Sequence, residues 1–566
     1  PSPRTRRAPS ERSSSSTQGP VAARPTRLRL RPWQKAALDR LAATTSKDFL
    51  AVATPGAGKT TFALTAAVQN LSDHPGRRVV VVAPTSHLKF QWASAAAQLG
   101  LHLEPAWSAR DGVLPADMHG IVTTYQQVAT SSHELAKLAA DAFVVLDEIH
   151  HAGDDRAWGE AVTTAFGGAA VRLSLSGTPF RSDTAAIPFV DYHLDEARAD
   201  YEYGYGDALG DGGVVRPVYF PRIGGFMEWV DAGGDTVAAT FDDELDRERS
   251  NQRLRTALSL EGQWLPTVLD QAVERLAELR QEHPEAGGLV IAADQEHAKG
   301  IADLLRSRHR VKVVVATSDD PDASDHISRF AAGTEPWIVA VRMVSEGVDV
   351  PRLRLAVFAT TTTTELFFRQ AVGRVVRWTK GVPDQRAYFF VPDDPRLRQH
   401  ATSMAEQRRH SLRRKQEERE ERGEVETDDE GQMSLFSVIG SVATESSGHE
   451  APGVFGADPD TRALEGDDDL GVDVLLLPPP LPDGRVVVGG ADDGAPDDGM
   501  TLRQKKVQLR DANAGVVNEL HIATGQPRAQ INNELNRLAG CNSVTEATLA
   551  QLQRRLDHGR RWLQRF

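Results

Sequence analysis

The stretch FLAVATPGAGKTT, residues 49–61, joins a short apolar run to a glycine-rich turn and then to a helical pattern. In this arrangement the backbone N–H groups of the turn, at the start of a new helix, can approach phosphate oxygens. The first helical turn then supplies Lys59 for the β- and γ-phosphates and the hydroxyl of Thr60 for Mg²⁺. The stretch therefore predicts a nucleoside triphosphate site at the end of a strand. The residues expected to hold ATP from this loop are Gly56, Gly58, Lys59, Thr60 and Thr61.

Similar apolar runs continue along the chain in two series. The first contains FLAVAT (49–54), RVVVVAP (78–84), GIVTTY (120–125), FVVLDE (143–148) and RLSLSG (172–177). The second contains GLVIAAD (288–294), VKVVVATS (311–318), WIVAVR (337–342), LRLAVFAT (353–360) and AYFFVP (387–392). Continuous Val, Ile and Leu runs that alternate with helical patterns are typical of parallel sheets buried on both faces. The sequence therefore predicts two α/β domains.

Two adjacent carboxylates follow one of these runs, in VVLDEIHHAG (144–153). An apolar strand would deliver both to the same edge of the sheet as the glycine-rich turn. There Asp147 is expected to bind Mg²⁺ through water, and Glu148 to orient and deprotonate an attacking water. The two stretches together predict an ATP-hydrolysing site.

Charge is distributed unevenly along the 566 residues, whose formal net charge is -14. Residues 1–31 carry eight Arg against one Glu, and residues 426–500 carry eighteen acids against two Arg. Residues 501–566 return to eleven Lys and Arg against five acids. Basic ends therefore flank an acidic segment, and the total charge says little about a polyanionic partner.

Cysteine content and hydropathy narrow the class of protein. Cys541 is the only cysteine, so the chain alone cannot build a disulfide framework or a cysteine-rich zinc module. No run approaches the roughly 20 apolar residues that span a bilayer, and the start lacks a signal-peptide core. We expect a cytoplasmic, nucleoid-associated protein with no membrane partner.

Changes in composition suggest the domain organisation, which includes a Gly- and Tyr-rich insert with a hairpin near 217–230. Residues 426–500 are expected to be disordered, because they bury too little apolar surface to offset chain entropy. The predicted order is a disordered basic arm (1–27), a first α/β domain (28–200), an insert and connector (201–262), a second α/β domain (263–400), a charged helix (401–425), an acidic disordered linker (426–500) and a basic helical domain (501–566).

Eight short motifs resemble those of helicase superfamily 2 and occur in the family's order. They are LRPWQKAAL (30–38), GAGKT (56–60), VVAPTSHLKFQW (81–92), IVTTYQQV (121–128), DEIHH (147–151), SGTPFR (176–181), VRMVSEGVDVPRL (341–353) and QAVGRVVR (370–377). DEIHH is similar to the DEAH-type box. The residues of these motifs are most similar to those of restriction-type motor subunits and of DNA repair helicases of the RadD and XPB kind. The resemblance covers roughly residues 28–395 and implies two tandem RecA-like domains that share one ATP site.

The resemblance also implies residue roles. At the nucleotide it implies Gln34 as the base reader with Arg31 or Trp33 in support, Gly347 and Asp349 at the domain interface, Gln370 facing the γ-phosphate, and Arg374 and Arg377 as arginine fingers. On the nucleic-acid backbone it implies Pro84, Thr85, Thr123, Thr124, Gln126 and Arg181. It also implies that Ser176, Thr178 and His150 couple hydrolysis to strand movement. One departure is that RadD-like proteins carry a cysteine-rich zinc element, which this chain cannot form.

These implications favour an ATP-dependent DNA helicase or translocase in repair, recombination or replication restart, using ATP and Mg²⁺ on single-stranded, forked or duplex DNA. One alternative is the motor component of a restriction or phage-defence system. An RNA helicase is a second alternative, and a clamp-bound scaffold with a vestigial ATP site is a third. Intact Lys59, Asp147, Glu148, Arg374 and Arg377 speak against the scaffold.

Two segments outside the motor suggest partners. QMSLF (432–436) is an apolar island in the acidic segment and resembles the pentapeptide by which bacterial DNA-processing proteins bind the sliding clamp. Its expected contacts are Gln432, Met433, Leu435 and Phe436. The basic C-terminal helices either add a DNA contact or present a solvated basic face. The residues concerned there are Lys505, Lys506, Arg528, Arg554, Arg555, Arg560 and Arg561, while Trp562 and Leu563 are expected in the core.

Overall fold

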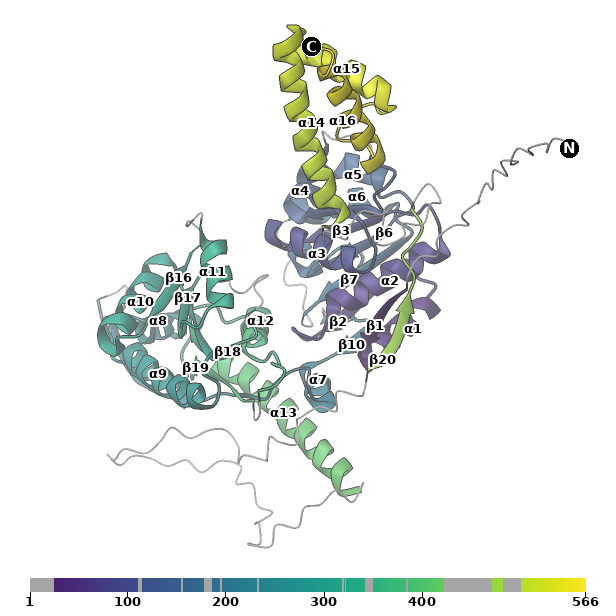
Figure 1. Ribbon diagram of the computed structural model, residues 1–566. Helices are drawn as coiled ribbons and strands as arrows, with labels where there is room; N and C mark the ends of the chain where they lie inside the picture. Colours follow the sequence, from purple (N-terminus) through teal and green to yellow (C-terminus); the bar gives the residue numbers. More distant parts are fainter. Residues whose placement is uncertain are drawn as a thin grey trace, which may run out of the picture.

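The computed structural model describes residues 25–109, 114–153, 156–177, 186–193, 196–231, 234–317, 320, 322–341, 350–382, 385–421, 471–481 and 500–566. It contains two parallel β-sheets that are each covered by helices, and a three-helix bundle close to the C-terminus (Figure 1). This confirms the predicted α/β class with two RecA-like domains and a C-terminal helical part. None of the described helices is long and apolar enough to cross a bilayer.

The first sheet has the strand order β10-β2-β7-β6-β3-β5-β4, with every pair parallel. Its strands are β2 (Asp48–Ala53), β3 (Val79–Ala83), β4 (Leu103–Glu104), β5 (Gly120–Thr124), β6 (Phe143–Leu146), β7 (Val171–Ser176) and β10 (Tyr201–Tyr203). The helices of this domain are α1 (Pro32–Ala43), α2 (Lys59–Asp73), α3 (Ser86–Gln98), α4 (Tyr125–Thr130), α5 (Ser132–Leu138) and α6 (Arg156–Phe166). A further helix, α7 (Tyr205–Asp211), follows β10 and packs against α13 (Pro395–Glu421) of the second domain. A 3₁₀ helix, Ile149–Gly153, follows β6, and a small pair, β8 (Tyr192–His193) and β9 (Glu196–Ala197), precedes β10.

Burial along the strands explains why the sequence shows continuous apolar runs. All five residues of β3 are buried, and successive side chains face opposite sides of the sheet. Val79 and Val81 belong to one apolar cluster, whereas Val80 and Val82 belong to another. Because helices cover both faces, both sets of positions must be apolar.

Strand order also decides what meets at the edge of the sheet. Strand β7 lies between β2, which leads into the glycine-rich turn, and β6, which leads into the acidic pair. In a parallel sheet the carboxyl ends of neighbouring strands share one edge. The turn, the acidic pair and Gly177 after β7 therefore lie together.

The second sheet repeats the architecture with the order β11-β19-β18-β15-β17-β16, and β12 also pairs with β19. Its strands are β11 (Val218–Tyr219), β12 (Arg222–Ile223), β15 (Gly287–Ala292), β16 (Val313–Ala316), β17 (Trp337–Ala340), β18 (Leu353–Ala359) and β19 (Ala387–Pro392). The accompanying helices are α8 (Arg247–Ala257), α9 (Trp264–Glu282), α10 (Gln295–His309), α11 (Ala323–Ala332), α12 (Glu365–Val375) and α13 (Pro395–Glu421).

The segment expected to be an insert, 201–262, is divided between the two sheets. Strand β10 forms the edge of the first sheet beside β2, and β11 and β12 extend the second sheet beside β19. The expected hairpin is present but lies further along, as β13 (Phe226–Val230) and β14 (Thr236–Thr240). Strands of two or three residues are too short to show a hydrophobic period, which is why the sequence did not reveal them.

Part of the expected disordered linker is ordered. Strand β20 (Val472–Leu476) pairs antiparallel with β1 (Thr26–Leu30), just before α1. The chain then runs over the first domain, where Leu476, Pro478, Pro479 and Leu481 are buried. We call residues 471–481 the strap. The assignment of 426–500 as a disordered linker is therefore wrong for this stretch, because its VDVLLLPPPL run has enough apolar side chains to bury.

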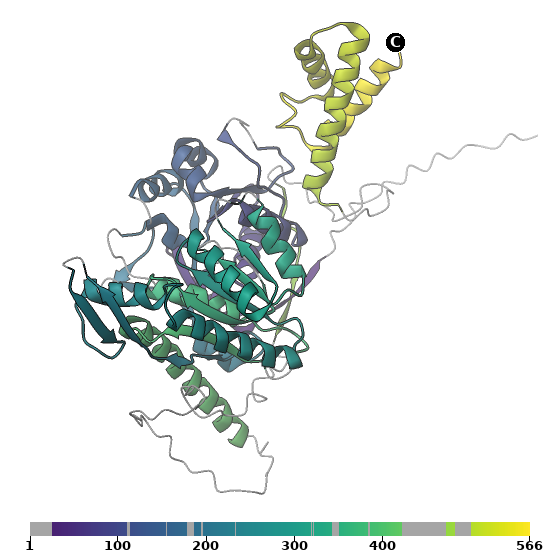
Figure 2. The same ribbon diagram turned by 90° about the vertical axis from the view of Figure 1, so that its left-hand side faces the viewer.

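The C-terminal bundle consists of α14 (Leu502–Thr524), α15 (Arg528–Ala539) and α16 (Leu549–Leu563), which pack around their own small core. Its helices rise from the first domain, and α14 makes the connection (Figures 1 and 2). At the contact, Lys506 Nζ donates to Asp117 Oδ1 over 2.7 Å, and the Leu549 amide donates to Asp117 Oδ2 over 2.7 Å. Both side chains of this ion pair are buried. Lys506 is therefore a docking residue, and Arg555 is also buried, inside the bundle.

Candidate nucleotide site

The glycine-rich turn has the backbone conformation that its sequence requires. Gly56 and Gly58 have φ of 83° and 93°, a left-handed region that side chains disfavour. Helix α2 begins at Lys59, so Thr60 and Thr61 lie on its first turn. Lys59 Nζ donates to the Ala53 carbonyl over 3.1 Å, which bends the side chain back over the turn. The turn thus opens on a helix N-terminus, where the helix dipole favours an anion.

Three side chains at the start of α1 hold three successive carbonyl groups of this turn. Arg31 Nη1 donates to Gly56 O over 2.9 Å, Trp33 Nε1 to Ala57 O over 3.0 Å, and Gln34 Nε2 to Gly58 O over 2.9 Å. Gln34 Oε1 also accepts from the Arg31 amide over 2.8 Å. These bonds keep the carbonyl oxygens on the α1 side of the turn. The oxygens therefore do not point into the loop, where they would repel the phosphate oxygens of a nucleotide.

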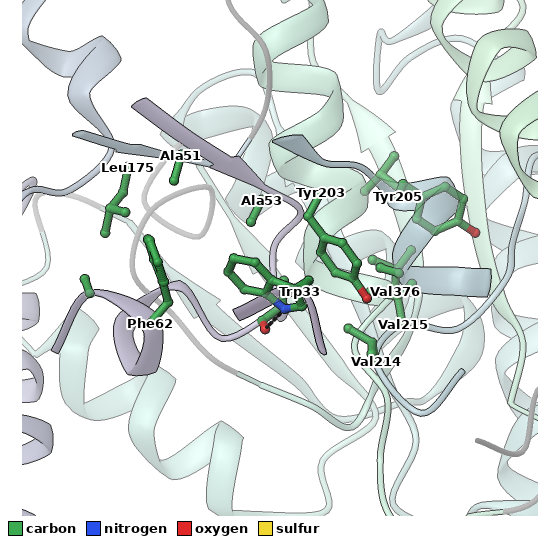
Figure 3. Close-up of a cluster of buried hydrophobic side chains, with 14 of the residues drawn as sticks. Trp33, Ala51, Ala53, Phe62, Leu175, Tyr203, Tyr205, Val214, Val215 and Val376 are labelled. Atoms are coloured by element: carbon green, nitrogen blue, oxygen red, sulfur yellow. Dashed lines mark hydrogen bonds between the residues drawn. The ribbon is translucent and has the colours of Figure 1, made fainter. Parts of the chain in front are cut away.

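Trp33 is a core residue as well as a hydrogen-bond donor. Its ring stacks on Tyr203 at 5.1 Å between centroids, with 14° between the ring planes, and it also contacts Phe62 (Figure 3). Strand β10 therefore supports the glycine-rich turn indirectly, through Tyr203 and Trp33. The sequence suggested base recognition for Arg31, Trp33 and Gln34, and the structure adds that all three shape the phosphate loop.

The acidic pair lies beside Lys59, and its two members have different surroundings. Glu148 Oε1 is 3.4 Å from Lys59 Nζ, and Glu148 Oε2 accepts from the Gly177 amide over 2.9 Å. Burial alone would raise the pKa of Glu148, but Lys59, His150 and the Gly177 amide outweigh it and lower the pKa to about 2. Glu148 has φ of 47°, a strained conformation of the kind found at functional sites.

Asp147 is held by an indole. Trp92 Nε1 of α3 donates to Asp147 Oδ2 over 2.9 Å, and Asp147 is nearly inaccessible to solvent. Burial and the neighbouring Glu148 charge raise the pKa of Asp147 to about 6, against the opposing effects of Lys59 and Trp92. A buried carboxylate with a raised pKa, next to a second carboxylate, lies in an excess of negative charge. A divalent cation would relieve that excess.

The donor set suits Mg²⁺ bound together with a nucleotide. Mg²⁺ usually takes one or two protein ligands and completes its shell with phosphates and water. Asp147 and the Thr60 hydroxyl are hard oxygen donors of this kind. In the part of the chain that the structure describes, no group of three or more His, Cys, Asp or Glu side chains could hold a metal by itself. Bound Mg²⁺ would neutralise phosphate charge at this edge.

His150 joins the two domains. Its Nε2 accepts from the amide nitrogen of Gln370 over 3.0 Å, because that nitrogen can only donate. Its Nδ1 lies 3.4 Å from Ser176 Oγ and 3.7 Å from Glu148 Oε2. The structure therefore brings together His150, Ser176 and Gln370, which the sequence assigned to coupling and to the γ-phosphate.

The second domain reaches the phosphate loop through α12 and the residues after it. An ideal Cβ on Gly373 would lie 2.5 Å from Pro55 Cγ, so α12 approaches the loop as closely as a glycine permits. A Cβ on Gly56 would lie 3.5 Å from Cγ of Arg377. Burial lowers the pKa of Arg377 to about 10, so it stays charged at neutral pH. Arg374 lies in the last turn of α12.

Arg216 supports this arginine-bearing segment, and sequence reasoning missed it. The fully buried guanidinium donates to the carbonyls of Pro351 and Arg377 and to Thr379 Oγ1, with 2.9 Å to Pro351 and 3.0 Å to Thr379. Burial, together with the nearby Arg354, lowers the pKa of Arg216 well below its usual value. A single Arg outside any motif gave no signal in the sequence.

The described residues expected to contact nucleic acid lie just before α3, at the end of β5 and on the first turn of α4. Thr85 is the N-cap of α3, and Pro84 and Thr85 are half-buried. Thr124 Oγ1 accepts from the Gln127 amide over 3.2 Å and caps α4, and Gln126 is exposed. Thr123 is fully buried inside the sheet, so in this conformation its side chain offers no contact to a strand.

Several predicted site residues lie outside the described residues. They are Thr178, Arg181, Gly347, Asp349 and the four clamp-motif residues Gln432, Met433, Leu435 and Phe436. Their roles stay predictions from the sequence.

Comparisons with known proteins agree with this arrangement of two domains. Residues 27–181 match the family model "Type III restriction enzyme, res subunit", and residues 270–379 match "Helicase conserved C-terminal domain". These domains imply the use and hydrolysis of ATP.

Two relatives that match over most of their length come from mycobacteria. The uncharacterized protein Rv2917 of Mycobacterium tuberculosis is 40% identical over 558 residues, which cover 93% of this chain and 92% of the relative. The uncharacterized protein ML1624 of Mycobacterium leprae is 38% identical over 566 residues and is covered to 93%.

Among solved structures, a fragment described as an HsdR subunit of a type I restriction enzyme from Vibrio vulnificus YJ016 is 17% identical, with a TM-score of 0.46 over 65% of each chain. The two helicase domain models match in order, each on one parallel-sheet domain, and between them lies the shared nucleotide site. The chain belongs to helicase superfamily 2, in the part of it related to the motor subunits of restriction enzymes.

Proposed function

We propose that this protein is an ATP-driven DNA helicase or translocase that acts in repair, recombination or replication restart. The observation that carries the proposal is the division of the nucleotide site. The phosphate loop, Asp147 and Glu148 belong to the first domain, whereas Gln370, Arg374 and Arg377 belong to the second. Since neither domain holds the full set, ATP would close the cleft and hydrolysis would release it.

Named roles follow from the geometry. Lys59 and the N-terminus of α2 would bind the phosphates, and Thr60 and Asp147 would hold Mg²⁺. Glu148, with its lowered pKa and its position fixed by the Gly177 amide, would orient the attacking water. Arg374 and Arg377 would stabilise the charge that develops on the transferred phosphoryl group. Alternate closing and opening would then move the backbone contacts on α3 and α4 along a strand.

DNA is favoured as the track by the match of residues 27–181 to a restriction-enzyme subunit, since restriction enzymes act on DNA. The test is the ATPase rate with no nucleic acid, with single-stranded, duplex and forked DNA, and with RNA. Strong stimulation by DNA alone supports the proposal, and the preferred form of DNA narrows the role. Stimulation by RNA alone would overturn the DNA assignment, and stimulation by none would favour the scaffold alternative.

The same match favours a second candidate, the motor component of a restriction or phage-defence system. Such a motor would work with a nuclease or methylase partner. Purification of the tagged chain from its own cells, followed by identification of bound proteins, separates the two candidates. Recovery of a nuclease or methylase in constant ratio favours the defence role.

We also propose the bacterial sliding clamp as a partner through QMSLF, residues 432–436. Three apolar side chains within an acidic stretch suit a docking peptide. A pull-down with purified clamp tests this against the double variant Leu435→Ala, Phe436→Ala. Loss of clamp recovery in the variant supports the partner, and equal recovery removes it.

A further inference from the structure

Trp92 connects the Mg²⁺ site to a helix assigned to the nucleic-acid track. It lies on α3, seven residues after the N-cap Thr85, and its side chain is buried. Its indole N–H donates to Asp147 Oδ2 over 2.9 Å. A hydrogen bond to a carboxylate is charge-assisted and directional, so the indole selects one orientation of Asp147.

Tyr125 makes a second connection from a second element. It is the first residue of α4, directly after the N-cap Thr124, and it is buried. Its hydroxyl donates to the backbone carbonyl of Asp147 over 2.9 Å, and its ring stacks on Trp158 with 5° between the planes. The side chain of Asp147 is thus fixed from α3, and its backbone is fixed from α4.

The two donors come from the elements that begin with Thr85 and Thr124, the residues expected to lie on the nucleic-acid backbone. A small rigid shift of α3 or α4 would move the indole or the hydroxyl, because packed helices shift as units. Asp147 would follow, since it is buried and hydrogen-bonded to both. Groups that orient a metal ligand commonly change metal affinity or activity by roughly 10- to 100-fold when they are removed.

We propose that Trp92 and Tyr125 are positioning residues, which orient Asp147 toward Mg²⁺ and carry the effect of a strand bound at α3 and α4 to the hydrolytic site. The inference rests on the proposed function, because it takes Asp147 as the Mg²⁺ ligand and α3 and α4 as part of the nucleic-acid track. It adds a physical route by which nucleic acid could stimulate hydrolysis. Neither residue was identified from the sequence.

The test compares Trp92→Phe and Tyr125→Phe in the full chain. Each variant removes one hydrogen-bond donor and keeps an aromatic ring. Trp107→Phe is the matched control, because Trp107 is equally buried in the first domain and its indole nitrogen has no hydrogen-bond partner among the described residues. Circular dichroism and thermal unfolding would first establish that all three variants are folded.

Two measurements decide the outcome. The first is the affinity of the ADP complex for Mn²⁺, followed by electron paramagnetic resonance. The second is the ATPase rate against Mg²⁺ concentration, with and without DNA. Trp92→Phe is expected to weaken Mn²⁺ binding about 10-fold, raise the half-saturating Mg²⁺ concentration, and reduce the stimulation by DNA. Tyr125→Phe should act in the same direction, and Trp107→Phe should match the wild type.

The inference is overturned if both variants bind Mn²⁺ and respond to DNA as the wild type does. It is also overturned if Trp107→Phe causes the same losses as Trp92→Phe, because packing alone would then explain them. Weaker Mn²⁺ binding with unchanged stimulation would support the positioning role and overturn the coupling role. A wild-type protein that no nucleic acid stimulates would contradict the proposed function, while Mn²⁺ binding would still decide the positioning role.

Discussion

Asp147 and Glu148 are neighbours in the chain, yet their surroundings move their pKa values in opposite directions. Glu148 faces Lys59 and the Gly177 amide, which favour its charged form. Asp147 is less accessible to solvent than Glu148 and feels the charge of Glu148. Two carboxylates with different environments can take different tasks, and the tasks proposed above for Glu148 and Asp147 are water activation and metal binding.

Glu148→Gln tests the assignment of the general base. The amide keeps the size of the side chain, so nucleotide binding should stay near the wild-type level. Hydrolysis should fall by roughly 10²- to 10⁴-fold, the usual contribution of a general base. Binding of a fluorescent ATP analogue and a steady-state ATPase assay check the two parts. The exposed Glu134→Gln serves as control, and normal turnover in Glu148→Gln would remove Glu148 from the mechanism.

At the residue scale, the sequence predicted the residues that lie in short motifs. It missed the residues whose role depends on contacts with distant parts of the chain. Lys59 and the acidic pair were identifiable because local spacing carries their chemistry. Trp92, Tyr125 and Arg216 were not, since their partners are 22 to 163 residues away in the chain. For Arg31 and Gln34 the sequence suggested the base, and their bonds to the loop carbonyls became visible only in the fold.

Among the elements, α12 of the second domain lies directly against the phosphate loop of the first. Gly373 stands at that contact, directly opposite Pro55. Alanine is more favourable than glycine in a helix interior by about 1 kcal/mol. A substitution of Gly373 by alanine would therefore not weaken the helix, and it tests the contact between the domains.

Gly373→Ala should therefore leave folding intact and reduce ATP hydrolysis by about 10-fold, since each factor of ten needs only about 1.4 kcal/mol of misplacement. The added methyl group would meet the Pro55 ring and hold α12 away from the loop. Thermal unfolding and ATPase kinetics check the two effects. Gly515→Ala on α14, where the methyl group meets nothing within 4 Å, is the control. Wild-type kinetics in Gly373→Ala would show that the cleft does not close through this contact.

A second element-scale prediction concerns the strap. His119 Nδ1 accepts from the His102 amide over 2.9 Å, so its Nε2 donates to the Pro479 carbonyl over 3.2 Å. Burial, with the nearby His102, lowers the pKa of His119 to about 4. The folded protein therefore binds fewer protons here than the unfolded chain between pH 6.5 and 4. This contribution to stability is complete above pH 6.5 and is lost as the pH falls toward 4.

The loss should reach about 3 kcal/mol, from the shift in pKa. Thermal unfolding of the wild type and of His119→Gln at a series of pH values would measure it. The wild type should lose more stability than the variant between pH 6.5 and 4, because only the wild type has the buried imidazole. Equal slopes for the two proteins would contradict the structure at His119.

Element types were easier to predict than element partners. Long, buried strands such as β3 were evident from their apolar runs, and the C-terminal helices were evident from their amphipathic period. The pairing of β1 with β20 joins positions 446 residues apart, which no local pattern encodes. The surrounding acidic composition also concealed the apolar run of the strap.

At the scale of the whole molecule, a buried ion pair between Lys506 and Asp117 joins the C-terminal bundle to the first domain. Burial lowers the pKa of Lys506, and Asp117 opposes that shift by stabilising the ammonium group. Arg503 Nε, 3.6 Å from Glu104 Oε1, adds a weaker contact beside it. A buried pair is costly to break on one side only, because the remaining charge keeps its desolvation penalty.

Asp117→Asn should therefore undock the bundle at a cost of roughly 3–5 kcal/mol. Hydrogen exchange should become faster along α14, and the phosphate loop should keep its protection. Mass spectrometry after exchange locates the change to peptides. Asp511→Asn, an exposed acid on the same helix, should leave the exchange pattern unchanged. Unaltered exchange of α14 in Asp117→Asn would mean that other contacts hold the bundle.

The pairing of β1 with β20 has a mechanical consequence. The linker enters the pair at Val472, whose partner is Leu30, the residue directly before Arg31. In an antiparallel pair, a pull on Val472 from the linker is resisted at that same end of the pair. The paired residues would therefore separate one after another, starting with Val472 and Leu30. A load on the linker thus acts first on Leu30, one residue from the side chains that hold the phosphate loop. Tension on the linker would therefore act next to the nucleotide site.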